Sequence, residues 1–512
     1  MKLLRSVPEI SQWVNPSYAM IITPRLTLLL LNLITFSCIK KMCKAYSVNL
    51  GCACLLWSFS YVYYTFLTRS FSNTLETFLF CTSILLLVNL RSLFSVIQQD
   101  LVLFTSSRAD KKKKEAAFEN LKKNYRKLKR DSFVLGVVLC FGVFNRSTFP
   151  IFMLVPLLSW FDFIYRTDLI KQGFVSLCLT LISGLLTFLS LTFFNSLYYN
   201  PEFGHLLTDL YSSLVEQKFD VALEVSTLLI SAARIPPFNF ILFNMSPYNL
   251  SQHGLHPWYT HLTVNLATLL GPLMILICFK VLGMVFNVRK REKVDELYAT
   301  MLMPVIILSL FPHQEARFLL PIVPVAIVCA AHSSVARWSI FKFIFLLFNL
   351  CGFAMFGLFH QGGLVPAMSN LHKTVIKDNS NSNLSINIIS YSSYMIPRHI
   401  LFHEKSSLLR LNIDDNIEGQ NHLPTLQFRL QEMNRNCGKE EKCEYYVLLA
   451  EPGLRDILSV KSWKVEQIKA FCPHFSGERL PELLPLDSYK TEKGWRHLYN
   501  QLCLNVVKIA FV

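Results

Sequence analysis

Charged residues are scarce in this chain, and their scarcity excludes a soluble multidomain protein. Of 512 residues, 34 are acidic and 50 are Lys or Arg, so only 16% carry a charge, whereas 52% are hydrophobic. An ordinary soluble domain has about 25% charged residues. The composition therefore indicates a polytopic membrane protein.

Several motifs of soluble enzymes and metalloproteins are also missing. The sequence contains no Gly-rich phosphate loop, no HExxH metal motif and no GxSxG nucleophile motif. Cys437 and Cys443 are not followed by a second ligand pair at the spacing of a zinc site, so we expect no bound metal. Residues 1–20 contain no secretory signal peptide.

Long apolar windows dominate what is present. A helix needs about 17 to 25 mostly apolar residues to cross a bilayer. Ten windows approach this length, which predicts an all-α polytopic membrane protein of about ten spans. Their approximate bounds are 21–40, 46–66, 72–96, 132–147, 149–165, 172–195, 262–287, 297–312, 318–335 and 339–360.

Basic residues orient these windows. Lys and Arg accumulate in every second connection, most densely at 108–130, and basic connections face the cytoplasm. This pattern accounts for most of the net charge of +16. Because the run has little aromatic interleaving, we expect no nucleic-acid partner. Glycosylation sequons beginning at Asn244 and Asn249 in an opposite connection, and at Asn383 in the tail, support a lumenal location for that side.

The last third of the sequence is more polar and predicts a small α/β lumenal domain at 367–512, after a membrane domain at 21–366. We interpret Asp378 to Asn387 as an Asn- and Ser-rich linker, and Tyr445 to Leu449 as a strand. Cys437, Cys443, Cys472 and Cys503 are an even number in an oxidising compartment, so one or two disulfides are expected.

Ionisable residues gather at the predicted lumenal ends of the spans. A charge at bilayer depth costs about 2.5 to 3.5 kcal/mol, so such residues normally have a partner or a task. Snorkelling or helix capping could explain any single one, but five connections contribute to the same face. The candidate binding residues are Arg69, Asn73, Asn145, Arg146, His253, His256, His261, His313, Arg317, His360 and Gln361.

This face suits a substrate anchored in lipid, such as a sugar on an isoprenoid phosphate. Arg317, His313 and Arg69 could hold the departing phosphate. Glu76 and Glu315 are candidate bases for an acceptor hydroxyl, or ion-pair partners for a nearby Arg. His256 and His261 could bind sugar or phosphate or pack a loop, and their spacing disfavours a zinc pair on one helix face.

The segment His313-Gln-Glu-Ala-Arg-Phe-Leu-Leu-Pro321 resembles the His-Lys/Gln-Glu-x-Arg-Phe signature of glycosyltransferase family 22, which are GT-C enzymes of the endoplasmic reticulum membrane. The segment 358–363 adds to this likeness, which spans about residues 25–405. Other segments look most like the family branch that adds a fourth, side-branch mannose to the glycosylphosphatidylinositol (GPI) precursor. These segments are 69–76, 144–149, 249–265 and 394–399.

The resemblance implies an inverting α-1,2-mannosyl transfer on the lumenal side of the endoplasmic reticulum membrane. The donor would be dolichyl-phosphate-mannose and the acceptor the third mannose of a GPI precursor, with no cofactor, nucleotide sugar or metal. Family members carry a His-Pro-Asp-Glu-like motif after their first span, whose carboxylate is regarded as the base. Residues 1–20 hold only Glu9, and the span parity also lacks one helix, so we expect 1–20 to be the stub of a truncated amino terminus.

Three alternatives remain from the sequence. A transporter would show inverted hydropathy repeats and polar groups near the midplane, neither of which is present. A truncated form or pseudoenzyme could bind the donor lipid without transferring its sugar. A related family member could act on a lipid-linked N-glycan precursor instead.

Overall fold

The computed structural model describes residues 16–106, 110–244, 246, 255–286, 292–377, 383–391, 396–401, 409–417, 422–437, 442–476 and 491–511. It divides into two units. The helical unit comprises residues 28–349, and the second unit comprises 1–27 together with 350–512. Each unit has its own core.

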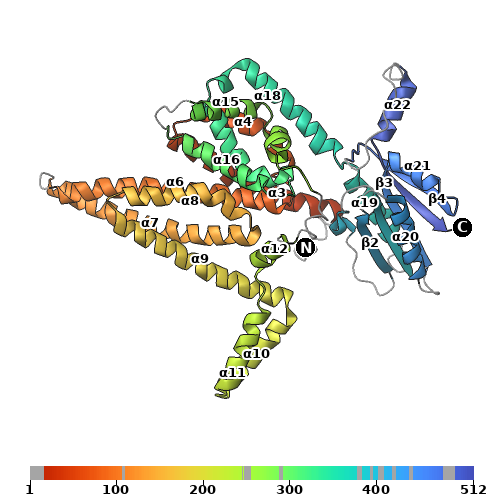
Figure 1. The fold of residues 1–512 in the computed structure, drawn as a ribbon, viewed down its shortest axis with the longest axis horizontal. Coiled ribbons are helices and arrows are strands. Elements are labelled where there is room, and N and C mark those ends of the chain that lie inside the picture. Colours follow the sequence, from red (N-terminus) through yellow and green to blue (C-terminus); the bar gives the residue numbers. More distant parts are fainter. Residues whose placement is uncertain are drawn as a thin grey trace, which may run out of the picture. The chain divides into compact units, whose positions relative to one another are not determined.

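Long antiparallel helices form one part of the helical unit (Figure 1). They are α6 (Ser72–Thr105), α7 (Lys111–Asn145), α8 (Phe149–Arg166) and α9 (Ile170–Tyr199). Small residues let α7 and α9 approach closely: the hydroxyls of Ser132 and Ser176 lie 2.6 Å apart, and a Cβ on Gly136 would lie 2.0 Å from the Thr180 carbonyl oxygen. The basic run 111–130 forms the first half of α7 rather than a separate connection.

Shorter helices build the rest of this unit. The break between α14 and α15 falls at Gly271, whose φ is +51° and whose Cβ would lie 2.4 Å from the Phe348 ring, so only glycine fits there. The elements are α3 (Pro16–Ala45), α4 (Leu50–Phe59), α5 (Tyr61–Thr65), α10 (Pro201–Val215), α11 (Phe219–Ala232), α12 (Pro236–Asn244), η1 (His261–Asn265), α14 (Leu266–Leu270), α15 (Pro272–Phe286), α16 (Asp295–Ser309), η2 (Ala316–Ile322), α17 (Val323–His332), η3 (Val335–Arg337) and α18 (Ser339–Gly352).

Five helices among the described residues are long and apolar enough to cross a membrane, or six if the bent pair of α11 and α12 is one span. This confirms a multi-pass membrane protein, whereas the number ten stays a prediction. The five are Ala19–Ala45, Ser72–Thr105, Phe149–Arg166, Ile170–Tyr199 and Ser339–Phe359. Other predicted windows are broken into pieces, as 46–66 is at Ser60 and 262–287 at Gly271.

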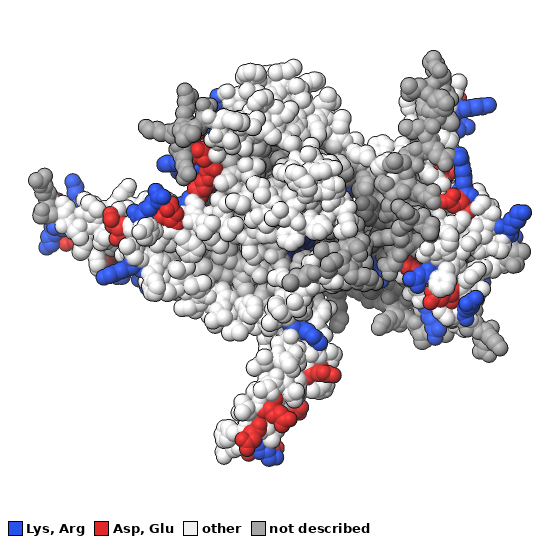
Figure 2. Space-filling model, in the orientation of Figure 1, with Lys and Arg blue, Asp and Glu red and all other residues white. Residues whose placement is uncertain are grey.

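Charge is distributed over the helical unit as a membrane-embedded surface requires. Figure 2 shows the Lys, Arg, Asp and Glu side chains of the long helices toward one end, with an uncharged surface along the rest of their length. Large apolar side chains are exposed on that surface, such as Leu181, Leu185 and Phe194 of α9. Lipid would cover them.

The second unit contains a five-stranded sheet in the order β2-β1-β3-β5-β4 (Figure 1). β1 pairs in parallel with β2 and β3, whereas β5 pairs antiparallel with β3 and β4. The elements are η4 (Phe353–Phe359), α19 (Leu364–Leu371), η5 (His372–Lys377), β1 (Leu384–Tyr391), η6 (Arg398–Leu401), β2 (Leu409–Ile417), α20 (His422–Arg435), β3 (Lys442–Ala450), α21 (Glu451–Leu458), β4 (Trp463–Phe471), α22 (Glu492–Gln501) and β5 (Leu504–Phe511). The prediction of a small α/β domain is confirmed, including the strand at 445–449.

Both faces of this sheet are packed. One core places Ile386 and Ile388 of β1 against α19, and the other places Ile389 and Tyr391 against Leu426 and Leu430 of α20. Two disulfides, Cys437–Cys443 and Cys472–Cys503, confirm the prediction of one or two bridges and supply their pairing.

The predicted linker was wrong at its carboxyl end. The residues from Leu384 to Asn387 form the first half of β1, while 378–382 lie outside the described residues. The polar composition concealed a strict alternation in which Leu384 and Ile386 face one core while Ser385 and Asn387 point to the other side. Period-two alternation, rather than Asn and Ser content, was the correct signal.

Candidate functional site

A buried ion pair joins α6 to the end of α7. The Glu76 side chain has no exposed surface, and its carboxylate lies 3.1 Å from the Nε of Arg146. The Thr148 hydroxyl donates to the same carboxylate at 2.7 Å, and the Asn73 amide donates at 3.4 Å. Three donors therefore surround one buried negative charge, as burial of an ion requires.

The connection after α7 is held against the start of α6. The Asn145 amide donates to the Ser72 carbonyl at 2.9 Å, and an Arg146 Nη1 donates to the Ser72 hydroxyl at 2.9 Å. Arg146 is thus fixed by both Ser72 and Glu76. This contact places the predicted candidates Asn73, Asn145 and Arg146 in one cluster.

A second ion pair forms in the loop before η2. The Glu315 carboxylate is paired with Arg317, whose Nη2 donates at 2.8 Å, and lies 2.9 Å from the Nε2 of His313. Burial by itself raises the pKa of Glu315, but the hydrogen bonds and positive charge of His313 and Arg317 outweigh it and lower that pKa to about 2. Glu315 is therefore ionised at neutral pH.

Gln314 connects this loop to the histidine segment. Its side-chain oxygen accepts from the His261 backbone N–H at 2.8 Å, and its side-chain amide donates to the Ser309 and Phe311 carbonyls at 2.9 and 3.1 Å. The Gln314 backbone N–H donates to the Nδ1 of His256 at 3.4 Å. A neutral His256 consequently carries its proton on Nε2.

Phe318 links the two ion pairs. The Arg146 guanidinium lies 5.2 Å from the centre of its ring, and the Arg317 guanidinium lies 5.9 Å from it. His313 packs edge-on against the same ring at 5.5 Å, and the His256 and His313 rings are 5.9 Å apart. Two cations and His313 are thereby assembled around one aromatic side chain, with His256 beside His313.

The structure brings together candidate residues from four of the five predicted lumenal connections. His253 lies outside the described residues, and His360 and Gln361 belong to the second unit, where both contact Phe475. Arg69 lies just before α6, with its guanidinium 5.6 Å from the Phe66 ring. The cluster comprises Asn73, Glu76, Asn145, Arg146, His256, His261, His313, Glu315 and Arg317.

Both carboxylates are held in ion pairs, which was the alternative reading of Glu76 and Glu315. Glu76 has no surface from which an acceptor hydroxyl could reach it, and Glu315 is shared by His313 and Arg317. Their role as a catalytic base stays a prediction. The two carboxylates balance the two arginines, and the groups that the cluster exposes most are hydrogen-bond donors: the Arg317 side chain is 44% exposed, against 31% for Glu315 and 0% for Glu76, and His256 is exposed too.

Sequence reasoning missed Thr148, Gln314 and Phe318 as members of this site. All three stand within or beside segments already singled out, but neutral polar and apolar residues attract less notice than charges do. Gln314 offered a usable signal, because an amide placed between two apolar runs has to find buried partners. The only signal for Phe318 was its place as the last residue of the family signature, since aromatic residues are abundant throughout the chain.

We expect Gln314→Ala to destabilise the helical unit by at least about 2 kcal/mol, because each buried polar group left unsatisfied costs about 1 to 3 kcal/mol. Thermal unfolding of the purified protein in lipid nanodiscs would measure this loss. Gln98→Ala is the matched control, since the Gln98 amide also makes a side-chain hydrogen bond, to Asp168, but at an exposed position. Equal effects of the two substitutions would show that Gln314 does not hold the loops together.

With this geometry in place, sequence comparison identifies the family. The model of the Alg9-like mannosyltransferase family matches residues 3–403. The chain belongs to the Alg9-like mannosyltransferase family. The match includes the whole cluster described above, and it confirms the resemblance carried by His313 to Pro321. No solved structure matches the chain significantly.

The curated relatives of this Alg9-like chain described here are all named as GPI mannosyltransferases. It is 31% identical to GPI mannosyltransferase 4 of Candida albicans over 316 residues, which cover 61% of this chain and 52% of the relative. Identity to GPI mannosyltransferase 4 of Debaryomyces hansenii is 28%, covering 70% and 59%. Identity to human GPI alpha-1,2-mannosyltransferase 4 is 28%, covering 78% and 64%. The chain thus spans less than two thirds of each of these relatives.

Proposed function

We propose that the chain is a GPI mannosyltransferase that moves mannose from dolichyl-phosphate-mannose to the third mannose of a GPI precursor, forming an α-1,2 linkage with inversion. The reaction would take place on the lumenal side of the endoplasmic reticulum membrane. The names of the relatives support the reaction and the acceptor. The cluster around Phe318 supports the way in which the donor would be held.

The observation that carries the proposal is the pair of guanidinium groups flanking one aromatic ring. Arg146 and Arg317 both lie over Phe318, with His313 against the same ring. A phosphate that departs from a sugar carries growing negative charge, which fixed cations and hydrogen-bond donors stabilise. A donor with an isoprenoid tail would keep that tail in lipid and present its phosphate here.

Each residue has a distinct task in this proposal. Arg317, with an exposed side chain, would contact a phosphate oxygen directly, and His256 would donate from Nε2. Arg146 is more buried, with its side chain only 16% exposed, and would act through its fixed charge. Glu315 and Glu76 would orient the two guanidinium groups through their ion pairs.

Complementation of cells that lack the fourth GPI mannose tests the proposal. Mass spectrometry of the GPI head group should detect a fourth mannose when this chain is expressed. Failure to detect it, with the chain inserted at normal levels, would reject the transferase. An unrelated multi-pass protein at equal expression is the control.

A second candidate is favoured by the pairing of both carboxylates: binding of the donor lipid without transfer. This reading predicts no fourth mannose but retained, saturable binding of dolichyl phosphate to the purified chain. The same cells and a lipid-binding measurement therefore separate the two candidates.

A further inference from the structure

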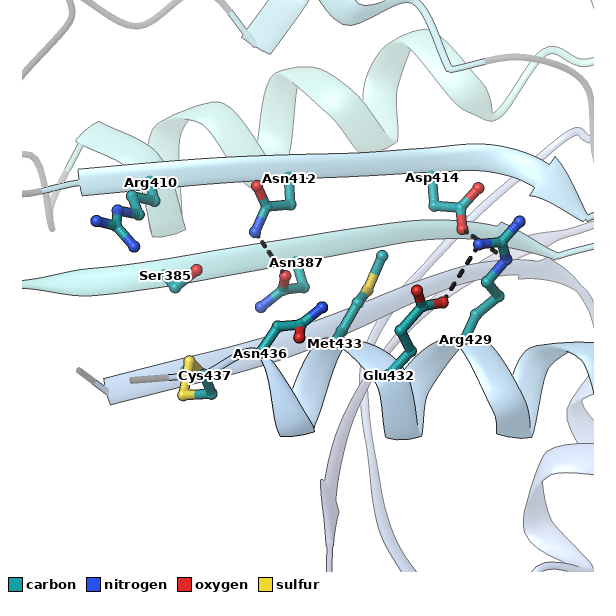
Figure 3. Close-up of a pocket in the computed structure, with 11 residues that line it drawn as sticks. Ser385, Asn387, Arg410, Asn412, Asp414, Arg429, Glu432, Met433, Asn436 and Cys437 are labelled. Atoms are coloured by element: carbon teal, nitrogen blue, oxygen red, sulfur yellow. Dashed lines mark hydrogen bonds and ion pairs between the residues drawn. A yellow bond between two sulfur atoms is a disulfide. The ribbon is translucent and has the colours of Figure 1, made fainter. Parts of the chain in front are cut away.

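A polar cavity of about 360 Å³ opens in the second unit, remote in sequence from the cluster around Phe318. It lies between the first halves of β1 and β2 and the last turns of α20 (Figure 3). Its volume is at the lower end of the range of about 300 to 1,000 Å³ for small-molecule sites. Of its lining residues, Ser385 and Asn387 fall in the segment that the sequence predicted to be a linker.

Polar side chains line the cavity on a sheet face that carries apolar core residues further along the strand. Ser385 pairs with Arg410 and Asn387 pairs with Asn412 across the two strands, so these four side chains share one face of the sheet. Further along that face, Ile389 packs into the core with α20. Ser385 and Asn387 are nevertheless only 5% and 2% exposed. Burying an amide has a cost that an apolar side chain would avoid.

Hydrogen bonds hold the amides of the cavity in place. The Asn412 amide donates to the Asn387 side-chain oxygen at 3.0 Å, and the Asn387 amide donates to the Glu444 carbonyl at 3.4 Å. Figure 3 shows the Asn436 side chain near this pair, directly after the end of α20. Each amide carries two donor hydrogens and a carbonyl oxygen, so paired amides can both give and accept hydrogen bonds from one ligand.

The charges around the cavity balance. Arg429 lies 3.6 Å from Asp414 and 3.3 Å from Glu432, and Arg410 is the other cation of the lining. Two cations and two carboxylates leave no net charge, which disfavours a phosphate or an isolated metal ion as the ligand. Balanced charges with several amides match a neutral ligand that has many hydroxyl groups.

An apolar wall completes the cavity. Met433 and the Cys437–Cys443 disulfide border the amides at the end of α20. A hexose has hydroxyl groups at its edge and C–H groups on its faces, so it can use both the polar stripe and this wall. Burial of the C–H groups against this wall adds favourable free energy.

We propose that this cavity is a binding site for a neutral hexose-containing glycan. The choice of a mannose-containing glycan as its ligand rests on the proposed function, in which the acceptor carries mannose. A site in the second unit would retain that glycan in addition to whatever contacts the helical unit makes with it. Hydrogen bonding by Asn412 and Asn387 would select a polyol over an anion.

Saturation-transfer NMR with the full-length chain in lipid nanodiscs would test the proposal, because detergents with sugar head groups would compete. The probes are α-1,2-mannobiose and, separately, inorganic phosphate. Mannobiose is expected to show saturable binding that Asn412→Ala weakens at least fivefold. Gln431→Ala is the matched control, since Gln431 is an exposed amide on α20 that does not line the cavity.

Three outcomes would overturn the proposal: no mannobiose binding by the native chain, unchanged binding by Asn412→Ala, or displacement of mannobiose by inorganic phosphate. Asn412 is exposed on an edge strand, and an unchanged melting temperature of its variant would exclude misfolding. Failure of the glycan-site proposal can be distinguished from failure of the proposed transferase activity. The first is measured by mannobiose binding, and the second by the presence of the fourth mannose in cells. A chain could bind mannobiose without transferring mannose, or transfer it without this cavity.

Discussion

Replacing Arg146 with alanine is expected to lower the free energy of unfolding of the helical unit by about 3 to 5 kcal/mol, which is the usual cost of breaking one side of a buried ion pair. The reason is that Glu76 has no exposed surface, so removing Arg146 would leave its carboxyl group buried without the cation that now offsets its desolvation. Thr148 and Asn73 would still donate to it, but neither brings charge. Unfolding can be followed with a thiol-reactive dye, because Cys38, Cys81 and Cys329 are buried in this unit.

The double variant Glu76→Gln/Arg146→Ala should be more stable than Arg146→Ala alone, because a glutamine can accept from Thr148 without a buried charge. Arg166→Ala is the control with an exposed ion pair. The side chains of Arg166 and Asp162 are 75% and 53% exposed and lie 2.8 Å apart, so removing Arg166 should cost less than about 1 kcal/mol. If Arg146→Ala were no more damaging than Arg166→Ala, the ion pair with Glu76 would not be a structural element of the site.

The sequence predicted class and family well because both depend on features that are local in the chain. Hydropathy windows identify apolar helices such as α6 and α9 directly, and the segment from His313 to Pro321 carries the family signature in nine residues. The number of spans is harder to predict, because helix breaks at Ser60 and Gly271 depend on packing against other segments. The first half of β1 was missed because its Asn and Ser content suggested a linker.

The candidate site could be predicted in outline, because charged residues near the ends of apolar helices are few and conspicuous. Convergence of residues 73–76, 145–146, 256–261 and 313–317 followed from sidedness alone. The partner of Arg146 did not follow from sidedness, because it depends on which helices are neighbours. Pairing of Arg146 with Glu76 requires knowing that the end of α7 lies beside the start of α6, whereas Arg317 and Glu315 are only two residues apart.

Arg317→Ala is expected to reduce mannosyl transfer by at least about 100-fold, since removing one group that stabilises a developing anion typically lowers kcat by about 100- to 1,000-fold. Stability should change little, because the Arg317 side chain is 44% exposed. Arg317→Lys should retain part of the activity, because lysine keeps the charge but not the planar pair of donors. Transfer from dolichyl-phosphate-mannose to a GPI acceptor, assayed in membranes with normalised protein levels, would measure each effect.

A control for this prediction has to remove an arginine from a similar ion pair without touching the cluster. Arg166, at the end of α8, pairs with Asp162 at 2.8 Å and is 75% exposed, so Arg166→Ala should leave transfer unchanged.

The substitution Glu315→Gln provides a second comparison. Because the pKa of Glu315 is lowered to about 2, its charge is present at every physiological pH, and the substitution would release Arg317 and His313 from their shared partner. Transfer should then fall through misorientation of Arg317, with a smaller loss than Arg317→Ala produces. Full activity of Arg317→Ala, at normal insertion, would refute the contact between this guanidinium and the departing phosphate.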